Sequence, residues 1–120
     1  MLTDRSALRA ALPSALVALD FDGTLAPISP HPDDARPVAG VHQVLRDVRA
    51  TGAAVAIVSG RSVASLLQVS GLDAVPGIVI YGLHGVERWA NGELRAPAPP
   101  AGIDELRARL PKIEIGRAHV

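Results

Sequence analysis

Three short apolar runs, separated by segments with helical periodicity, constrain the fold of this 120-residue chain most strongly. The runs cover residues 16–19, 53–58 and 78–81, and the first lacks the alternation of apolar and polar residues that a half-exposed strand shows. Strands that alternate with helices in this order form βαβ units and therefore a parallel sheet. We predict an α/β protein with a Rossmann-like parallel sheet, in which the first strand is buried on both faces.

Caps and breaking residues predict where the helices begin and end. Three helical segments are expected, with starts at Thr3, Val38 and Ser62 and ends at Pro13, Gly52 and Gly71. After the third strand, Asn91-Gly92 separates residues 86–90 from residues 93–96 and is the two-residue signature of a type I′ hairpin. Residues 96–102 contain three prolines and indicate a linker, after which a further helix is expected to begin, with Leu106 and Leu110 in phase.

Composition excludes several classes of function. Twelve basic and twelve acidic residues cancel, so the sequence carries no electrostatic signal for nucleic acid or an anionic membrane. The absence of cysteine excludes disulfides and thiolate metal sites. No apolar run approaches the roughly 20 residues needed to cross a bilayer. We expect a soluble, cytoplasmic protein that is a monomer when complete and acts on a small molecule.

A polar motif follows each of the three predicted strands. Residues 20–24 read Asp-Phe-Asp-Gly-Thr, residues 59–61 read Ser-Gly-Arg, and residues 82–85 read Gly-Leu-His-Gly. In an open parallel sheet, ligands bind beyond the carboxyl ends of the strands. The coincidence of the three motifs with three strand ends predicts a ligand site at that edge.

The residue types in these motifs fit phosphoryl transfer. Asp20 and Asp22, spaced i and i+2 on extended backbone, are expected to project to the same side and to flank one reacting group. Mg²⁺ would relieve their repulsion, Asp20 could attack phosphorus, and Asp22 could serve as general acid and base. The hydroxyls of Thr24 and Ser59, with backbone amides nearby, could bind the phosphoryl oxygens.

Other interpretations of the same residues remain open. Asp-x-Asp-Gly also occurs in calcium loops, but those need a glutamate at the twelfth position, where this chain has His31. The Ser59-Gly60-Arg61 turn could serve only as a helix cap followed by a solvated arginine. His84 could be structural, and Glu87 precedes a hairpin turn and could belong to an exposed face.

The motifs together resemble a known enzyme family. The first and second motifs resemble those of haloacid dehalogenase superfamily phosphatases. With the third block, Tyr81-Gly82-Leu83-His84-Gly85-Val86-Glu87, the chain is similar to the trehalose-6-phosphate phosphatases from residue 16 to about residue 96. In that family the third block usually reads Gly-Asn-His-Gly or Gly-Ser-His-Gly. Leu83 departs from this pattern and removes one side-chain contact.

The resemblance implies a role for each site residue. Asp20 would be the nucleophile and a Mg²⁺ ligand, and Asp22 would be the acid/base whose backbone carbonyl also binds the metal. Ser59 and Gly60 would bind the transferring phosphoryl group. Arg61, His84 and Glu87 would lie toward the sugar side of the pocket. The implied reaction is hydrolysis of trehalose 6-phosphate through an aspartyl-phosphate.

Several parts that the resemblance implies are not found after residue 96: the downstream lysine, the acidic residues that complete the metal shell, and the substrate-gripping cap. We therefore interpret residues 1–113 as an incomplete N-terminal phosphatase core. Residues 114–120 look like the in-frame translation of a sequencing adapter, which suggests a non-native tail. The alternatives are a phosphatase for a related sugar phosphate, such as sucrose phosphate, and a non-catalytic binding fragment.

Overall fold

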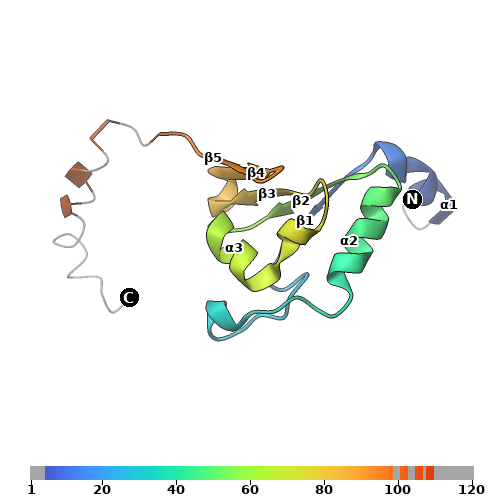
Figure 1. The fold of residues 1–120 in the computed structure, drawn as a ribbon, viewed down its shortest axis with the longest axis horizontal. Coiled ribbons are helices and arrows are strands. Elements are labelled where there is room, and N and C mark those ends of the chain that lie inside the picture. The colour runs from blue at the N-terminus through green and yellow to red at the C-terminus, as the bar shows by residue number, and fades with distance from the viewer. Residues whose placement is uncertain (1–4, 99–100, 103–104, 107, 110–120) are drawn as a thin grey trace.

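A computed structural model describes residues 5–98, 101–102, 105–106 and 108–109. In it, the strands form one sheet in sequence order: β1 (Leu16–Leu19), β2 (Ala54–Val58), β3 (Val79–Gly82), β4 (Glu87–Ala90) and β5 (Glu93–Arg95). The first three strands are parallel to one another, whereas β4 and β5 are antiparallel to their neighbours (Figure 1). The predicted parallel sheet and the antiparallel appendage after it are both confirmed.

Among the described residues, α1 (Arg5–Ala11), α2 (Val41–Ala50) and α3 (Val63–Ser70) are continuous α-helices, and residues 105–106 and 108–109 are also helical. Short 3₁₀ turns cover Leu12–Ser14 (η1), Pro32–Asp34 (η2), Leu72–Ala74 (η3) and Leu83–Gly85 (η4). As expected, the Ser62 side chain caps α3, where its Oγ accepts a hydrogen bond from the N–H of Ser65 at 3.1 Å. The expected cap at Thr3, the continuation of the last helix to Leu110 and the tail at 114–120 lie outside the described residues.

The helix α2 begins later than the spacing of apolar residues predicts. It starts at Val41, after Gly40, and not at Val38. The N–H of Val38 donates to the carbonyl oxygen of Leu25 at 2.8 Å, so this residue is tied to the loop that follows β1. The apolar periodicity therefore begins before the helix does. Val38 fits the helical spacing, but as an apolar residue it can equally belong to a loop.

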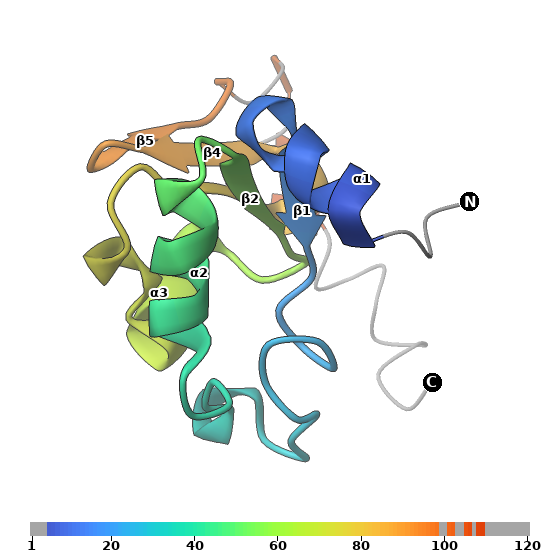
Figure 2. The same ribbon diagram turned by 90° about the vertical axis from the view of Figure 1, so that its right-hand side faces the viewer.

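The core lies between one face of the sheet and helices α2 and α3. Val55, Ile57 and Ile80 pack there against Leu45 and Leu66, and each of these five residues is at most 2% exposed. Figures 1 and 2 place both helices on the same side of the sheet. Burial of these side chains supplies the main driving force that holds the layers together.

The opposite face of the sheet is largely uncovered within the described part of the chain. Leu16 on β1 is 67% exposed and Val58 on β2 is 43% exposed. The prediction that the first strand is buried on both faces is therefore wrong. An unbroken apolar run indicates that both faces can be covered, but α2 and α3 pack on the same face and α1 buries none of its residues.

The hairpin between β4 and β5 matches its prediction in detail. Both central residues have positive φ angles, 53° for Asn91 and 77° for Gly92, as a type I′ turn requires. Among the described residues, no helix is both long enough and apolar enough to reach across a membrane.

Candidate active site

The carboxyl ends of β1, β2 and β3 bring the three polar motifs together. Asp20 follows β1, Ser59 follows β2, and the turn η4 follows β3. A cavity of about 400 Å³ lies at this edge, lined by Ala18, Leu19, Asp20, Val58, Ser59, Gly60 and His84. One residue or more from each predicted motif thus borders the same cavity.

A second cavity of about 410 Å³ adjoins the first at Gly60. Its lining consists of Asp22, Ile28, Ser29, Pro32, Gly60 and Arg61. Gly60 borders both cavities and lies close to His84: a Cβ at position 60 would approach the imidazole Cε1 and Nε2 to 2.8 Å. Glycine at this position lets the backbone pass directly beneath the His84 ring.

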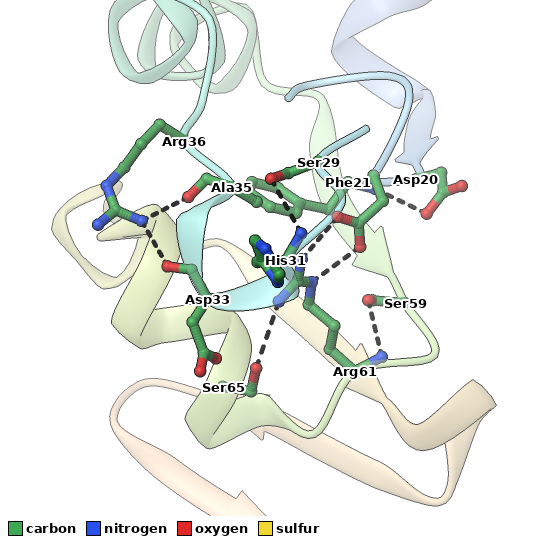
Figure 3. Close-up of polar contacts among 11 residues, drawn as sticks. Asp20, Phe21, Ser29, His31, Asp33, Ala35, Arg36, Ser59, Arg61 and Ser65 are labelled. Atoms are coloured by element: carbon green, nitrogen blue, oxygen red, sulfur yellow. Dashed lines mark hydrogen bonds and ion pairs between the residues drawn. The ribbon is translucent and has the colours of Figure 1, made fainter. Parts of the chain in front are cut away.

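Arg61 binds both carboxylate oxygens of Asp22. Its Nε donates to Oδ2 and its Nη2 donates to Oδ1, each at 2.8 Å, as Figure 3 shows for the Arg61 guanidinium. The Arg61 side chain is 11% exposed, and its guanidinium carbon lies 5.8 Å from the centre of the Phe21 ring. Such a bidentate ion pair fixes both the position and the orientation of the carboxylate.

This pair lowers the pKa of Asp22. The hydrogen bonds from Arg61 contribute most, burial opposes them, and the charge of Arg61 adds to the lowering. The same hydrogen bonds raise the pKa of Arg61. Asp22 is therefore held as the carboxylate anion, the form that can accept a proton.

Asp20 has a different environment. Its Oδ1 accepts a hydrogen bond from the N–H of Phe21 at 2.7 Å, and Figure 3 shows its side chain pointing away from the Arg61 guanidinium. The expectation that Asp20 and Asp22 face one reacting group is not met in this arrangement, because they line different cavities. The chain bends at Phe21 instead of continuing as extended backbone, and Arg61 holds Asp22 on the other side of Gly60.

Phe21 is a structural part of the site that the sequence interpretation did not identify. Its ring is fully buried, and its carbonyl oxygen accepts the N–H groups of Thr24, Leu25 and Ala26 at 3.1, 2.9 and 3.1 Å. These contacts wind the loop tightly after the first aspartate. The signal in the sequence is a large apolar residue between two acids in an otherwise polar turn.

Ser59 is placed as expected, at the edge of the first cavity. The residue is only 3% exposed, and its Oγ accepts the N–H of Arg61 at 3.0 Å. Its own N–H donates to the carbonyl oxygen of Tyr81 at 2.9 Å. The Ser59 hydroxyl is thus fixed between the strand end and the start of α3.

Two other predicted residues lie elsewhere. Thr24 lines an apolar cavity of about 480 Å³ beside α2, together with Val41 and Leu45 among others, and it borders neither cavity at the strand ends. Glu87 borders neither of those two cavities; its Oε1 accepts the N–H of Val63 at 2.9 Å. The structure therefore places Asp20, Ser59, Gly60 and His84 on one cavity and Asp22, Gly60 and Arg61 on the next.

The described residues offer an incomplete set of metal ligands. Within them, no group of three or more His, Asp or Glu side chains is close enough to share one ion. Asp20 contributes a hard carboxylate oxygen at the cavity. Mg²⁺ binds through one or two carboxylates plus substrate phosphate and water, so this donor set fits Mg²⁺ better than a fully protein-enclosed ion.

Comparison with known proteins identifies relatives of this chain. A family model described as trehalose-phosphatase matches residues 18–99. A trehalose-phosphate phosphatase of Mycobacterium ulcerans is 45% identical over 111 residues, which cover 85% of this chain and 27% of that protein. The chain thus spans about a quarter of the length of this curated relative.

Solved structures agree with the fold. The crystal structure of a protein related to trehalose-6-phosphate phosphatase aligns with a TM-score of 0.59 and 28% identity, covering 83% of this chain and 40% of the other. A haloacid dehalogenase-like hydrolase from B. subtilis aligns with a TM-score of 0.63 and 17% identity, covering 85% and 34%. The second likeness concerns the fold alone and confirms the haloacid dehalogenase-type sheet.

Proposed function

Because this chain belongs to the trehalose-phosphatase family, we propose that the complete enzyme hydrolyses a sugar phosphate monoester, with trehalose 6-phosphate as its substrate. The observation that carries the proposal is the position of Asp20. Its carboxylate borders a cavity at the carboxyl ends of the parallel strands, beside Ser59 and His84. That edge is where open α/β sheets bind their ligands.

In the proposed reaction, Asp20 is the nucleophile. A carboxylate oxygen attacks phosphorus, the bond from phosphorus to the sugar oxygen breaks, and the departing oxygen takes a proton from Asp22. Water then attacks the aspartyl-phosphate, Asp22 removes a proton from that water, and inorganic phosphate leaves. Ser59 holds a phosphoryl oxygen through its hydroxyl, while backbone amides of the same loop bind the others.

Asp22 must leave Arg61 to complete this cycle. Both of its oxygens are occupied by the guanidinium, and this pairing keeps it ionised. Its role as proton acceptor fits that state, whereas its role as proton donor requires that it leaves Arg61, takes up a proton and rotates toward the cavity that Asp20 borders. We propose that bound substrate draws Arg61 or Asp22 out of the pair, since a phosphate ester competes for the same guanidinium.

A divalent cation, in our proposal Mg²⁺, would be held by the Asp20 carboxylate and the Asp22 carbonyl. When bound, it supplies positive charge that offsets the repulsion between Asp20 and an anionic phosphate. The remaining ligands would come from the substrate, water and parts of the complete enzyme. We propose that this enzyme works as a monomer in the cytoplasm.

The proposal is tested by assaying phosphate release from a panel of sugar phosphates with a full-length enzyme that contains this chain. We expect preference for trehalose 6-phosphate, dependence on Mg²⁺, and loss of activity in Asp20→Asn. A preference for sucrose phosphate or another sugar phosphate would be consistent with the proposed reaction type but would overturn the assignment of trehalose 6-phosphate as the substrate. Comparable turnover by the Asp20→Asn enzyme would overturn the proposed nucleophile.

A further inference from the structure

Glu87 makes a contact from the sheet to helix α3 that its position in the sequence does not suggest. It begins β4, pairs with Gly82 of β3, and its Oε1 accepts the N–H of Val63 at 2.9 Å. Val63 is the first residue of α3, where backbone N–H groups have no partner within the helix. An anionic side chain at this end also interacts favourably with the helix dipole.

The start of α3 is therefore capped from two independent directions. Ser62, directly before the helix, accepts a hydrogen bond from the Ser65 N–H through its Oγ. Glu87, 24 residues beyond Val63, accepts a hydrogen bond from the Val63 N–H through its Oε1. A cap from a neighbouring residue stabilises the helix itself, but a cap from another strand also fixes where the helix lies relative to the sheet.

Three backbone hydrogen bonds join the same two regions. The N–H of Leu83 donates to the carbonyl oxygen of Arg61 at 2.8 Å, and the N–H of His84 donates to that of Ser59 at 2.9 Å. Ser59 in turn donates its N–H to Tyr81 at 2.9 Å. The loop of residues 59–62, which joins β2 to α3, is thus bound along its length to residues 81–87.

The segment that holds this loop is itself strained. Leu83 and His84 have φ angles of 49° and 56°, in the left-handed region that residues other than glycine rarely adopt; histidine does so more often than most, and leucine does not. Gly82 lies so close to α3 that a Cβ there would approach the Val63 nitrogen to 2.8 Å. A strained segment persists only where its surroundings hold it in place.

We infer that Glu87 is a positioning residue, which fixes the start of α3 and thereby the loop that presents Ser59. This inference rests on the proposed function only in assigning phosphate binding to that loop. This positioning role differs from a role in binding the sugar, because the Glu87 carboxylate is hydrogen-bonded to the backbone of α3 and borders neither cavity at the strand ends.

The first test uses nuclear magnetic resonance of this 120-residue chain labelled with ¹⁵N. Glu87→Ala removes the acceptor, Glu87→Gln retains an oxygen there, and Glu93→Ala is a matched control on β5, where the side chain is 65% exposed. We expect Glu87→Ala to shift the amide signals of Val63 and residues 59–61, and to speed exchange of the Val63 amide about tenfold. Glu93→Ala should leave them unchanged, and Glu87→Gln should restore exchange to within about threefold of the unmutated chain.

The second test titrates the same four proteins with inorganic phosphate in the presence of Mg²⁺. We expect Glu87→Ala to weaken phosphate binding about tenfold, since groups that orient a binding residue commonly have effects of this size. Glu87→Gln should recover most of the affinity.

The outcomes separate this inference from the proposed function. If Glu87→Ala changes the loop amides no more than Glu93→Ala does, or binds phosphate as tightly as the unmutated chain, the positioning role is overturned. If the unmutated chain binds no phosphate, the proposed function loses its support from this chain. The amide shifts and exchange rates then still decide whether Glu87 holds the loop.

Discussion

Arg61 and Asp22 form a bidentate ion pair in the site, and the positions of these residues in the sequence do not predict it. They are 39 residues apart, and only the adjacency of β1 and β2 brings them together. The sequence suggests that Arg61 is solvated or faces the substrate. In the structure, the Arg61 side chain is mostly buried and is paired with the Asp22 carboxylate. Removing either partner would leave the other charge partly buried and unpaired, which is costly.

This ion pair predicts a pH-dependent contribution to stability. The pKa of Asp22 is lowered in the folded chain, so the contribution is fully present above the unfolded-state pKa and is lost as the pH falls through the folded-state pKa. Asp22→Asn should therefore lower the urea midpoint clearly at pH 6 and progressively less below about pH 4. Urea unfolding at several pH values measures this, with the exposed Asp73→Asn as control. A difference between Asp22→Asn and the unmutated chain that stays constant from pH 6 to pH 3 would contradict the linkage.

Leu83 is the residue where this chain departs from the resemblance noted in its sequence. Its φ of 49° is costly for leucine and more readily adopted by asparagine, and its side chain is 41% exposed. We expect Leu83→Asn to raise the free energy of unfolding by about 1 kcal/mol. Leu83→Ala is the control, because alanine loses the apolar side chain yet keeps a Cβ in the strained conformation. Equal stability of these two variants in urea unfolding would show that backbone strain is not the cause.

At the scale of elements, local signals in the sequence predict the framework well. The Ser62 cap, Pro13 after the first helix and Asn91-Gly92 in the hairpin each act within a few residues, and each has its expected place. What local signals miss depends on distant partners. Val38 joins the loop after β1 instead of α2, and Glu87 caps a helix 24 residues earlier in the chain.

The hairpin turn offers a test at this scale. Gly92 has a φ of 77°, and a Cβ there would meet nothing within 4 Å. Gly92→Ala therefore tests backbone conformation alone, and we expect it to destabilise the chain by about 1 kcal/mol. Asn91→Gly, at the other central position, should be tolerated, since glycine adopts positive φ freely. Urea unfolding of both variants checks this, and an unchanged midpoint for Gly92→Ala would argue against the type I′ turn.

At the scale of the whole molecule, local sequence patterns could not locate the face of the sheet that the described residues leave uncovered. The apolar run of β1 is equally consistent with burial on one face or on two, and only the placement of α2 and α3 decides between them. Leu16 and Val58 consequently remain exposed, on a strand at the sheet edge and on its neighbour. Exposed apolar strands at an edge promote association between chains.

We therefore expect this chain to associate with itself at raised concentration. Leu16→Lys places a charge on the exposed edge strand and should shift the chain toward monomer in sedimentation velocity. Leu94→Lys is the matched control. Leu94 is also exposed, at 48%, but it lies on β5, at the opposite edge of the sheet from β1. A monomeric unmutated chain, or equal effects of the two substitutions, would show that this face does not drive association.

The most direct test of the account is to look for phosphate on Asp20. A full-length enzyme containing this chain would be mixed with trehalose 6-phosphate and Mg²⁺, quenched rapidly in acid, digested and examined by mass spectrometry. We predict a phosphoryl group on the peptide that carries Asp20, sensitive to hydroxylamine and absent in Asp20→Asn. Trehalose release without a phosphorylated Asp20 peptide, or a phosphoryl group on another residue, would contradict the account.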